Sequence, residues 1–207
     1  MTTAAAPRSA ARPRPATAVF VVASAFVASA LAAAGIAAGT DPEDGWQHAA
    51  RYTARCSFLL FVPVFIASSW NRLWPSGLSR AVVRRRRALG LAFAAAHTVH
   101  LYALVTYSRM AGNTPDAVTG IVGGGAYVAM FAMVATSNDA AVRWLGASWR
   151  RLHKVGIYWL WFVFTFTYAG RVAGGKVDFV PLLAAALAAQ GLRIAAWRRV
   201  RARRAAA

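Results

Sequence analysis

The chain is poor in cysteine and in acidic residues, and it lacks the short motifs of soluble enzymes. Its 207 residues include one cysteine, Cys56, and 6 acidic residues against 24 Lys and Arg. A single thiol excludes an internal disulfide and a zinc site built from thiolates. No glycine-rich nucleotide loop follows a strand pattern, and no Ser-His-Asp set or carboxylate pair suits hydrolysis. The sequence therefore holds no nicotinamide or flavin domain of its own.

The composition that remains is that of a membrane protein. Hydrophobic residues make up 58% of the chain, charged residues 14%, and the mean hydropathy is +0.44. A soluble domain carries about 25% charged residues. The net charge of +18 would suggest nucleic acid in a polar chain. Here the basic residues lie between long apolar runs, so we expect a lipid bilayer as the partner and no nucleic acid.

Six weakly charged runs are long enough to cross a hydrocarbon core about 30 Å thick. They predict an all-α membrane protein, a six-transmembrane-helix bundle with helices at about 16–39, 53–74, 88–108, 117–138, 153–170 and 179–197. Residues 1–15, rich in Ala, Pro and Arg, are expected to form a disordered basic tail. Residues 198–207 are expected to form a basic cytoplasmic tail against anionic headgroups.

The charges alternate between the connections of these runs. Nineteen Lys and Arg fall on one side and 5 on the other, which also holds 5 of the 6 acidic residues. Because Lys and Arg collect on the cytoplasmic side of a membrane, this split predicts cytoplasmic N and C termini.

Histidines are the main candidates for chemistry within these runs. His97 and His100 belong to the third run, and His153 begins the fifth. Ionisable side chains inside a bilayer are costly and mark functional sites. Residues three apart share a helix face, so His97 and His100 are expected to point toward the same neighbour. Imidazole is a common axial ligand of haem iron, and helical bundles hold such groups between facing helices.

Several motifs resemble the ferric reductase-like transmembrane family. They are Arg51–Arg55 before the second run, Arg86–Leu91 with His100, and the LGxxWxxLH pattern from Leu145 to His153. The similarity is greatest to the branch of haem-binding membrane subunits that serve bacterial periplasmic methionine sulfoxide reductases. It covers about Arg51 to Gly170.

This resemblance implies a b-type haem-binding subunit that passes electrons across the bacterial inner membrane. It implies one or two haem b groups, with His100 and His153 as axial ligands to the iron and His97 as a further cofactor-binding candidate. A separate quinol or flavoprotein would supply electrons, and a periplasmic reductase could accept them. Whether the chain is itself an enzyme, rather than the haem subunit of an oxidoreductase, is left open.

One position departs from the family pattern. The family usually has a further histidine 13 residues after the one matched by His153, where this chain has Phe166. At 1.5 Å per residue, His100 lies about 18 Å from the cytoplasmic edge and Phe166 about 16 Å, whereas His153 lies at the edge. Three schemes stay open: a tilted haem between His153 and His100 or His97, a five-coordinate haem on His100, and His97 paired with Met130.

A different class of function is also open. A non-redox membrane protein, such as a small transporter or an assembly factor, could use the same bundle after losing haem. Gly123, Gly124 and Gly125 remove side chains over one helical turn, which permits close approach of a helix or a flat cofactor. No carboxylate is available within the runs for proton coupling, which argues against a transporter.

Overall fold

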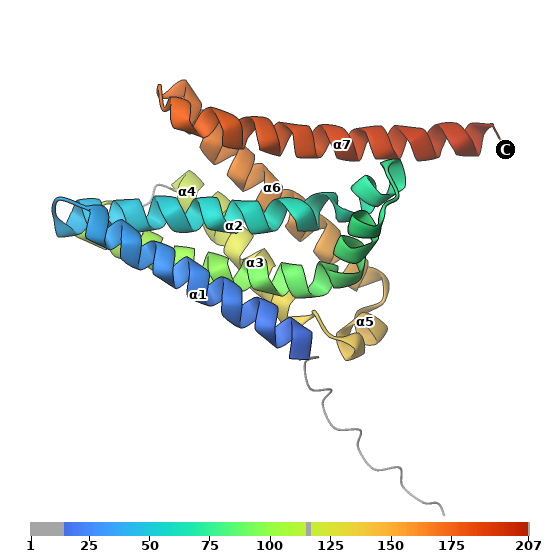
Figure 1. Ribbon diagram of the computed structural model, residues 1–207, viewed down its shortest axis with the longest axis horizontal. Helices are drawn as coiled ribbons and strands as arrows, with labels where there is room; N and C mark the ends of the chain where they lie inside the picture. Colours follow the sequence, from blue (N-terminus) through green and yellow to red (C-terminus); the bar gives the residue numbers. More distant parts are fainter. Residues whose placement is uncertain (1–14, 115–116, 207) are drawn as a thin grey trace, which may run out of the picture.

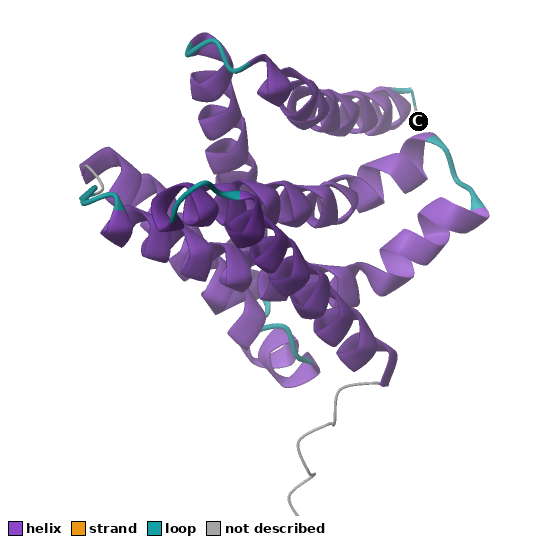
Figure 2. Ribbon diagram, turned by 60° about the vertical axis from the view of Figure 1, so that its left-hand side comes forward, coloured by secondary structure: helices purple, strands orange, loops and turns teal. Residues whose placement is uncertain are grey.

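The structure is a computed structural model that describes residues 15–114 and 117–206. Within these ranges the chain is helical and contains no strand, which confirms the expected all-α class (Figure 2). Except for Pro15, the tail expected at residues 1–15 lies outside the described residues. Asp116 and Ala207 also lie outside them. The elements are α1 (Pro15–Ala38), α2 (Pro42–Leu73), α3 (Gly77–Met110), α4 (Ala117–Ala135), α5 (Asp139–Leu145), α6 (Ala147–Ala173), the 3₁₀ helix η1 (Val177–Phe179) and α7 (Val180–Ala205).

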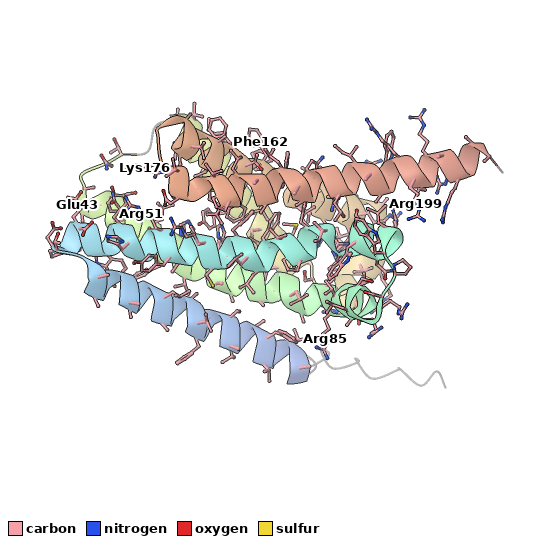
Figure 3. The ribbon with its side chains drawn as sticks, turned by 45° about the horizontal axis from the view of Figure 1, so that its top comes forward. Glu43, Arg51, Arg85, Phe162, Lys176 and Arg199 are labelled. Carbon is pink, nitrogen blue, oxygen red and sulfur yellow. The ribbon has the colours of Figure 1, made fainter. Side chains whose placement is uncertain are left out.

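Long helices run between two ends of the molecule, and the short α5 lies at one of them (Figure 1). We call this the basic end; it also holds the α2–α3 turn and the C-terminal part of α7. The opposite end holds the α1–α2 turn and η1. Arg85 and Arg199 lie at the basic end, whereas Glu43, Arg51 and Lys176 lie at the opposite end (Figure 3). The side chains thus divide between the ends as the charge pattern predicts.

Five helices among the described residues are long and apolar enough to cross a membrane, namely α1, α2, α3, α4 and α7 with η1. The multi-pass membrane character is therefore supported. The helix α6 is 27 residues long but is not among the five. Its sequence includes two tryptophans and two tyrosines between Val155 and Gly170, and these rings are only partly apolar. Six spans stay a prediction.

Two helices begin well before the uncharged runs that predict them. The helix α2 begins at Pro42, where the Asp41 carboxylate accepts a hydrogen bond from the Asp44 amide at 2.9 Å. The helix α3 begins at Gly77, where Ser76 and Ser79 form a capping box. The capping residues set where these helices begin. The charged residues that follow them do not interrupt the helix, because most charged side chains are good helix formers outside a bilayer. At 34 residues, α3 is about 51 Å long and extends beyond a 30 Å core.

The later helix bounds also differ from the expected ones. The helix α4 ends at Ala135 instead of 138, and the Asn138 side chain instead caps α5 by accepting from the Ala141 amide at 2.7 Å. Gly146, with φ of 49°, separates α5 from α6, which begins six residues before His153. The expected basic tail from residue 198 continues α7 as helix through Ala205. Its arginines therefore extend along a helix axis.

The first three helices pack closely through small residues. A Cβ atom added to Gly35 of α1 would lie 2.5 Å from the backbone nitrogen of Ala49 on α2. Gly39 is closer still to the backbone of Gly45. Ala49, Ala50 and Ala103 are buried together in a small cluster of α2 and α3. Backbones of α1 and α2 thus touch where no side chain intervenes.

Aromatic rings connect α2 and α3 to α6. The Phe164 ring on α6 lies 5.3 Å from Phe58 and 5.4 Å from Phe61, both on α2, and 6.4 Å from Phe93 on α3, measured between ring centroids. Tyr168 on α6 meets Phe58 edge-on at 5.0 Å. No Cα atom of α3 comes within 8 Å of one in α6 over their described lengths. Side chains alone fill the space between these two helices.

Candidate functional site

The two α3 histidines lie side by side within the bundle. The centroids of the His97 and His100 rings are 5.1 Å apart, as expected for residues on one helix face. His97 is buried, with 7% of its surface exposed. Its ring stacks on Phe93 at 5.1 Å and on Tyr127 of α4 at 4.8 Å, and lies 5.4 Å from Phe164. Helices α3, α4 and α6 thus enclose this histidine together.

A threonine from α2 orients His100. The Thr53 hydroxyl donates to the Ala49 carbonyl at 2.7 Å and lies 3.2 Å from Nδ1 of His100. A hydroxyl has one hydrogen to donate, so toward the imidazole this oxygen acts as the acceptor. The arrangement favours the tautomer of His100 that is protonated at Nδ1. Its Nε2 then carries the lone pair that a metal ion requires.

Polar atoms without partners lie around His97. Among the described residues, Nδ1 of His97 and the hydroxyls of Tyr127 and Tyr168 are buried and have no hydrogen-bond partner. An unsatisfied buried polar group costs about 1–3 kcal/mol. Two of these atoms belong to His97 and Tyr127, whose rings stack between α3 and α4, so a bound group there would find a donor and an acceptor. Tyr168 packs instead against Phe58 of α2 and Phe179 of η1.

His153 lies in a different part of the molecule. Its ring stacks on Trp149 with centroids 4.1 Å apart, and its Nε2 lies 3.2 Å from the hydroxyl of Thr136. That hydroxyl donates to the Ala132 carbonyl at 2.7 Å, so it accepts from the imidazole. The indole N–H of Trp149 also binds the Thr136 carbonyl at 2.9 Å. The nitrogen that usually meets haem iron is therefore engaged in a hydrogen bond.

A cavity of about 520 Å³ adjoins His153 at the basic end. Its inner wall is apolar, with Phe61, Phe93, Met130 and Leu160 among its residues. Its other lining residues include five cations and one carboxylate: Arg86, Arg87, Arg150, Lys154, Arg193 and Asp139. This volume falls within the usual range for small-molecule sites, roughly 300–1,000 Å³. Neither His97 nor His100 lines it.

The structure therefore separates the predicted ligands. His97 and His100 lie together, whereas His153 shares its cavity with Arg86, which precedes His97 by 11 residues. At 1.5 Å per residue, His97 is about 16 Å further along α3 than Arg86, while the apolar lining of the cavity reaches along α3 to Ala94. Met130, buried with 1% exposed, lines the His153 cavity. The sequence-based pairing of His100 with His153 remains a prediction.

Phe166 does not face the α3 histidines. Its side chain is 57% exposed, stacks on Phe162 at 5.8 Å, and lines a second hollow of about 400 Å³ between α4 and α6. Phe164, two residues earlier, contacts His97 instead. Residues two apart point to different sides of a helix, so counting depth alone could not make this distinction.

Sequence reasoning missed several groups around these histidines. Thr53 and Tyr127 lie within apolar runs, where threonine and tyrosine are common, and nothing in the sequence pairs them with His100 or His97. Arg193 lies near the end of the last apolar run, and its guanidinium lies over the rings of Phe65 and Tyr158 at 4.3 and 4.6 Å. Its position near the end of a run gave no sign of this contact.

The described residues hold no group of three or more His, Cys, Asp or Glu side chains suited to a metal ion. This is compatible with haem, whose porphyrin supplies four of the iron ligands. Comparison of the chain with protein-family models, curated proteins and solved structures finds no match. The function must therefore be argued from the geometry of the histidines.

Proposed function

We propose that the chain is a b-type haem-binding membrane subunit that transfers electrons across the bilayer. The observation that carries the proposal is the α3 histidine pair: His100 has its Nδ1 oriented by Thr53, and His97 has a buried Nδ1 without a partner among the described residues. Ionisable groups in membrane helices mark functional sites, and no acidic side chain among the described residues pairs with these two. The resemblance to ferric reductase-like proteins supports the same reading.

The imidazole donor atoms on the α3 side suit the iron of a haem. His100 would hold the iron through its Nε2, while His97 and Tyr127 would line the group. His153 is the predicted second ligand, and it would first have to release the Thr136 hydroxyl. Haem supplies one-electron chemistry at its iron, whose potential depends on the axial ligands and on hydrogen bonds to them. Thr53 would tune that potential through His100, and the rings of Phe93 and Phe164 would exclude water.

The proposal includes six spans with both termini in the cytoplasm of a bacterial inner membrane. The helix α6 would be the sixth span, enclosed on one side by α2, α4 and α7. Nineteen of the 24 Lys and Arg then face the cytoplasm, as the positive-inside rule requires. A quinol or a flavoprotein would donate electrons, and a periplasmic reductase would accept them, because the chain carries no nicotinamide or flavin motif.

The test is an absorption spectrum of the detergent-purified protein, expressed with ample haem. A dithionite-reduced minus oxidised difference spectrum with b-type bands is expected, with pyridine haemochrome giving the haem content. His100→Ala should lose most of the haem, and His153→Ala should lose or shift the bands if it is the second ligand. Circular dichroism and gel filtration report whether each variant is folded.

His48→Ala is the matched control. His48 lies at the opposite end beside Asp44, with a nitrogen–oxygen distance of 3.5 Å, and touches neither α3 histidine. It should keep the full haem content. A folded wild-type protein that binds no haem would overturn the proposal and favour the non-redox class, in which the bundle works without a cofactor.

A further inference from the structure

The cavity at the basic end combines an apolar interior with uncompensated positive charge. Five cations line it, and Asp139, the one carboxylate among its lining residues, pairs with Arg87 at 2.8 Å. Among the described residues no carboxylate lies within ion-pair distance of Arg86 or Arg193. Both side chains are half-buried. Two half-buried cations without a carboxylate partner would be stabilised by an anionic ligand.

The surrounding helices hold Arg193 in place. Its Nε donates to the Tyr158 hydroxyl at 3.2 Å, and another nitrogen donates to the Phe65 carbonyl on α2. The guanidinium also lies against the rings of both Phe65 and Tyr158, and other N–H donors of the fork are left for a ligand. Arg86 reaches Ser68 at 3.3 Å and lies close enough to repel Arg193 electrostatically. Guanidinium pairs of this kind match the oxygens of a phosphate.

The rest of the cavity selects for a ligand with an apolar part. Below the cations the walls are Phe61, Phe93, Met130 and Leu160, contributed by α2, α3, α4 and α6. Three of these helices are candidate membrane spans. The cavity thus lies where charged residues give way to apolar ones along the helices. Basic pockets between membrane helices at the cytoplasmic side are typical sites for anionic lipid headgroups.

We propose that this cavity binds an anionic phospholipid. Arg86 and Arg193 hold the phosphate, with Lys154 and Arg150 at the opening, and the first methylenes of an acyl chain lie against Phe61 and Met130. This inference does not depend on haem, since it rests on cations, and Arg86 lies about 16 Å along α3 from His97. The apolar wall extends further along α3 to Phe93, whose ring stacks on His97. A soluble phosphate compound would leave the apolar wall uncovered.

The experiment measures thermal unfolding of the full chain in a neutral detergent. Three additives are compared at equal concentration: dioctanoyl phosphatidylglycerol, dioctanoyl phosphatidylcholine and inorganic phosphate. The wild type should gain several degrees in Tm with phosphatidylglycerol and little with the other two, because a ligand stabilises the state it binds. Arg86→Gln and Arg193→Gln should each lose most of that gain.

Arg84→Gln is the matched control, since Arg84 belongs to the same cluster on α3, is exposed, and does not line the cavity. It should keep the wild-type gain. Because Arg193→Gln also removes contacts between α7 and α2, Arg86→Gln and Lys154→Gln provide variants that leave those contacts intact.

Three results would overturn the proposal. Equal stabilisation by both lipids would show that no anion is recognised. Equal stabilisation by inorganic phosphate would assign the cations to a soluble ligand. Loss of b-type absorption in Arg86→Gln, with an unchanged lipid response, would assign the cavity to the propionates of haem. Failure of the haem proposal alone leaves the lipid response intact, so the two are distinguishable.

Discussion

The helices α1–α3, here the N-terminal unit, are built differently from the helices α4–α7, the C-terminal unit. In the most apolar windows of α2 and α3, 39% of residues are buried, against 11% in α4, while the outer helices α1 and α7 are alike at 22%. The N-terminal unit brings backbones together through glycine, whereas the C-terminal unit depends on large rings that reach across gaps. Close backbone packing gives a unit its own core, while packing through rings depends on the neighbours.

The glycines illustrate the contrast. In α4, Gly123 and Gly124 have nothing within 4 Å of an added Cβ, and only Gly125 meets a neighbour, the ring of Trp159. The predicted close approach therefore holds at one position of that run. The glycines that backbones touch, Gly35, Gly39 and Gly45, carry no comparable signal in the sequence. A run of glycines is conspicuous, but geometry decides which one is needed.

The largest effect should come from filling the glycine contact of the N-terminal unit. Gly35→Leu places a side chain against the Ala49 backbone, which cannot yield as a side chain does, and should cost about 3 kcal/mol or more. Gly124→Leu on α4 should change stability by less than about 0.5 kcal/mol. Thermal unfolding in detergent measures both. Equal losses would remove the distinction between the units.

The second-largest loss of stability should come from removing the Phe164 ring, which joins the two units. Phe164→Ala should cost about 3 kcal/mol, because this buried ring contacts Phe58, Phe61 and Phe93 and leaves a cavity when removed. Phe162→Ala is the control, since that ring is 48% exposed. Chemical denaturation in mixed micelles compares the two variants. A control that unfolds as readily as Phe164→Ala would contradict the assignment of Phe164 as the joint.

Each unit also holds one threonine–histidine pair, and replacing the threonine should affect haem binding differently in the two pairs. Thr53→Val removes the acceptor for His100 Nδ1 and should weaken haem binding about 10–100-fold, as loss of a hydrogen-bond partner does for metal ligands. Thr136→Val frees His153 Nε2 and should leave haem affinity unchanged or raised. Haem titration followed by absorption measures both. Weakened binding in Thr136→Val alone would place the site in the C-terminal unit.

The smallest effect should come from the ion pair at the opposite end, between Arg55 of α2 and Asp178 of η1. Asp178 is 54% exposed, so water and salt screen the pair. Asp178→Asn should cost about 0.2–1 kcal/mol at low salt, and less at high salt. Unfolding of wild type and variant at two ionic strengths tests this. A loss that salt does not reduce would indicate a packing role instead.

The sequence predicts the helices better than it predicts their contacts. Uncharged runs locate the spans because apolar length is dictated by the bilayer, but Asp41 and Ser76 start α2 and α3 some eleven residues earlier. The shared face of His97 and His100 follows from helical period alone. Thr53 and Tyr127 beside them depend on how separate helices rotate about their axes. No local pattern encodes that rotation.

The cavity was beyond prediction for the same reason. Arg86 and Arg193 are 107 positions apart in the chain, yet they line one space because α3 and α7 both pack against α2. Charge counting identifies both as cytoplasmic anchors, but it does not predict that they share a cavity. Only the packing of α7 against α2 and α6 places Arg193 against the rings of Phe65 and Tyr158.

The self-contained packing of α1–α3 has a consequence for the order of synthesis. Phe164 follows Met110 by 54 residues, which a ribosome adds in about 3–10 s at 5–20 residues per second. During that interval the first three helices are complete, while Phe58, Phe61 and Phe93 still lack the ring that will cover them. The nascent three-helix intermediate therefore presents a temporary aromatic face within the membrane, on which a membrane chaperone or a lipid would have several seconds to act before α6 arrives.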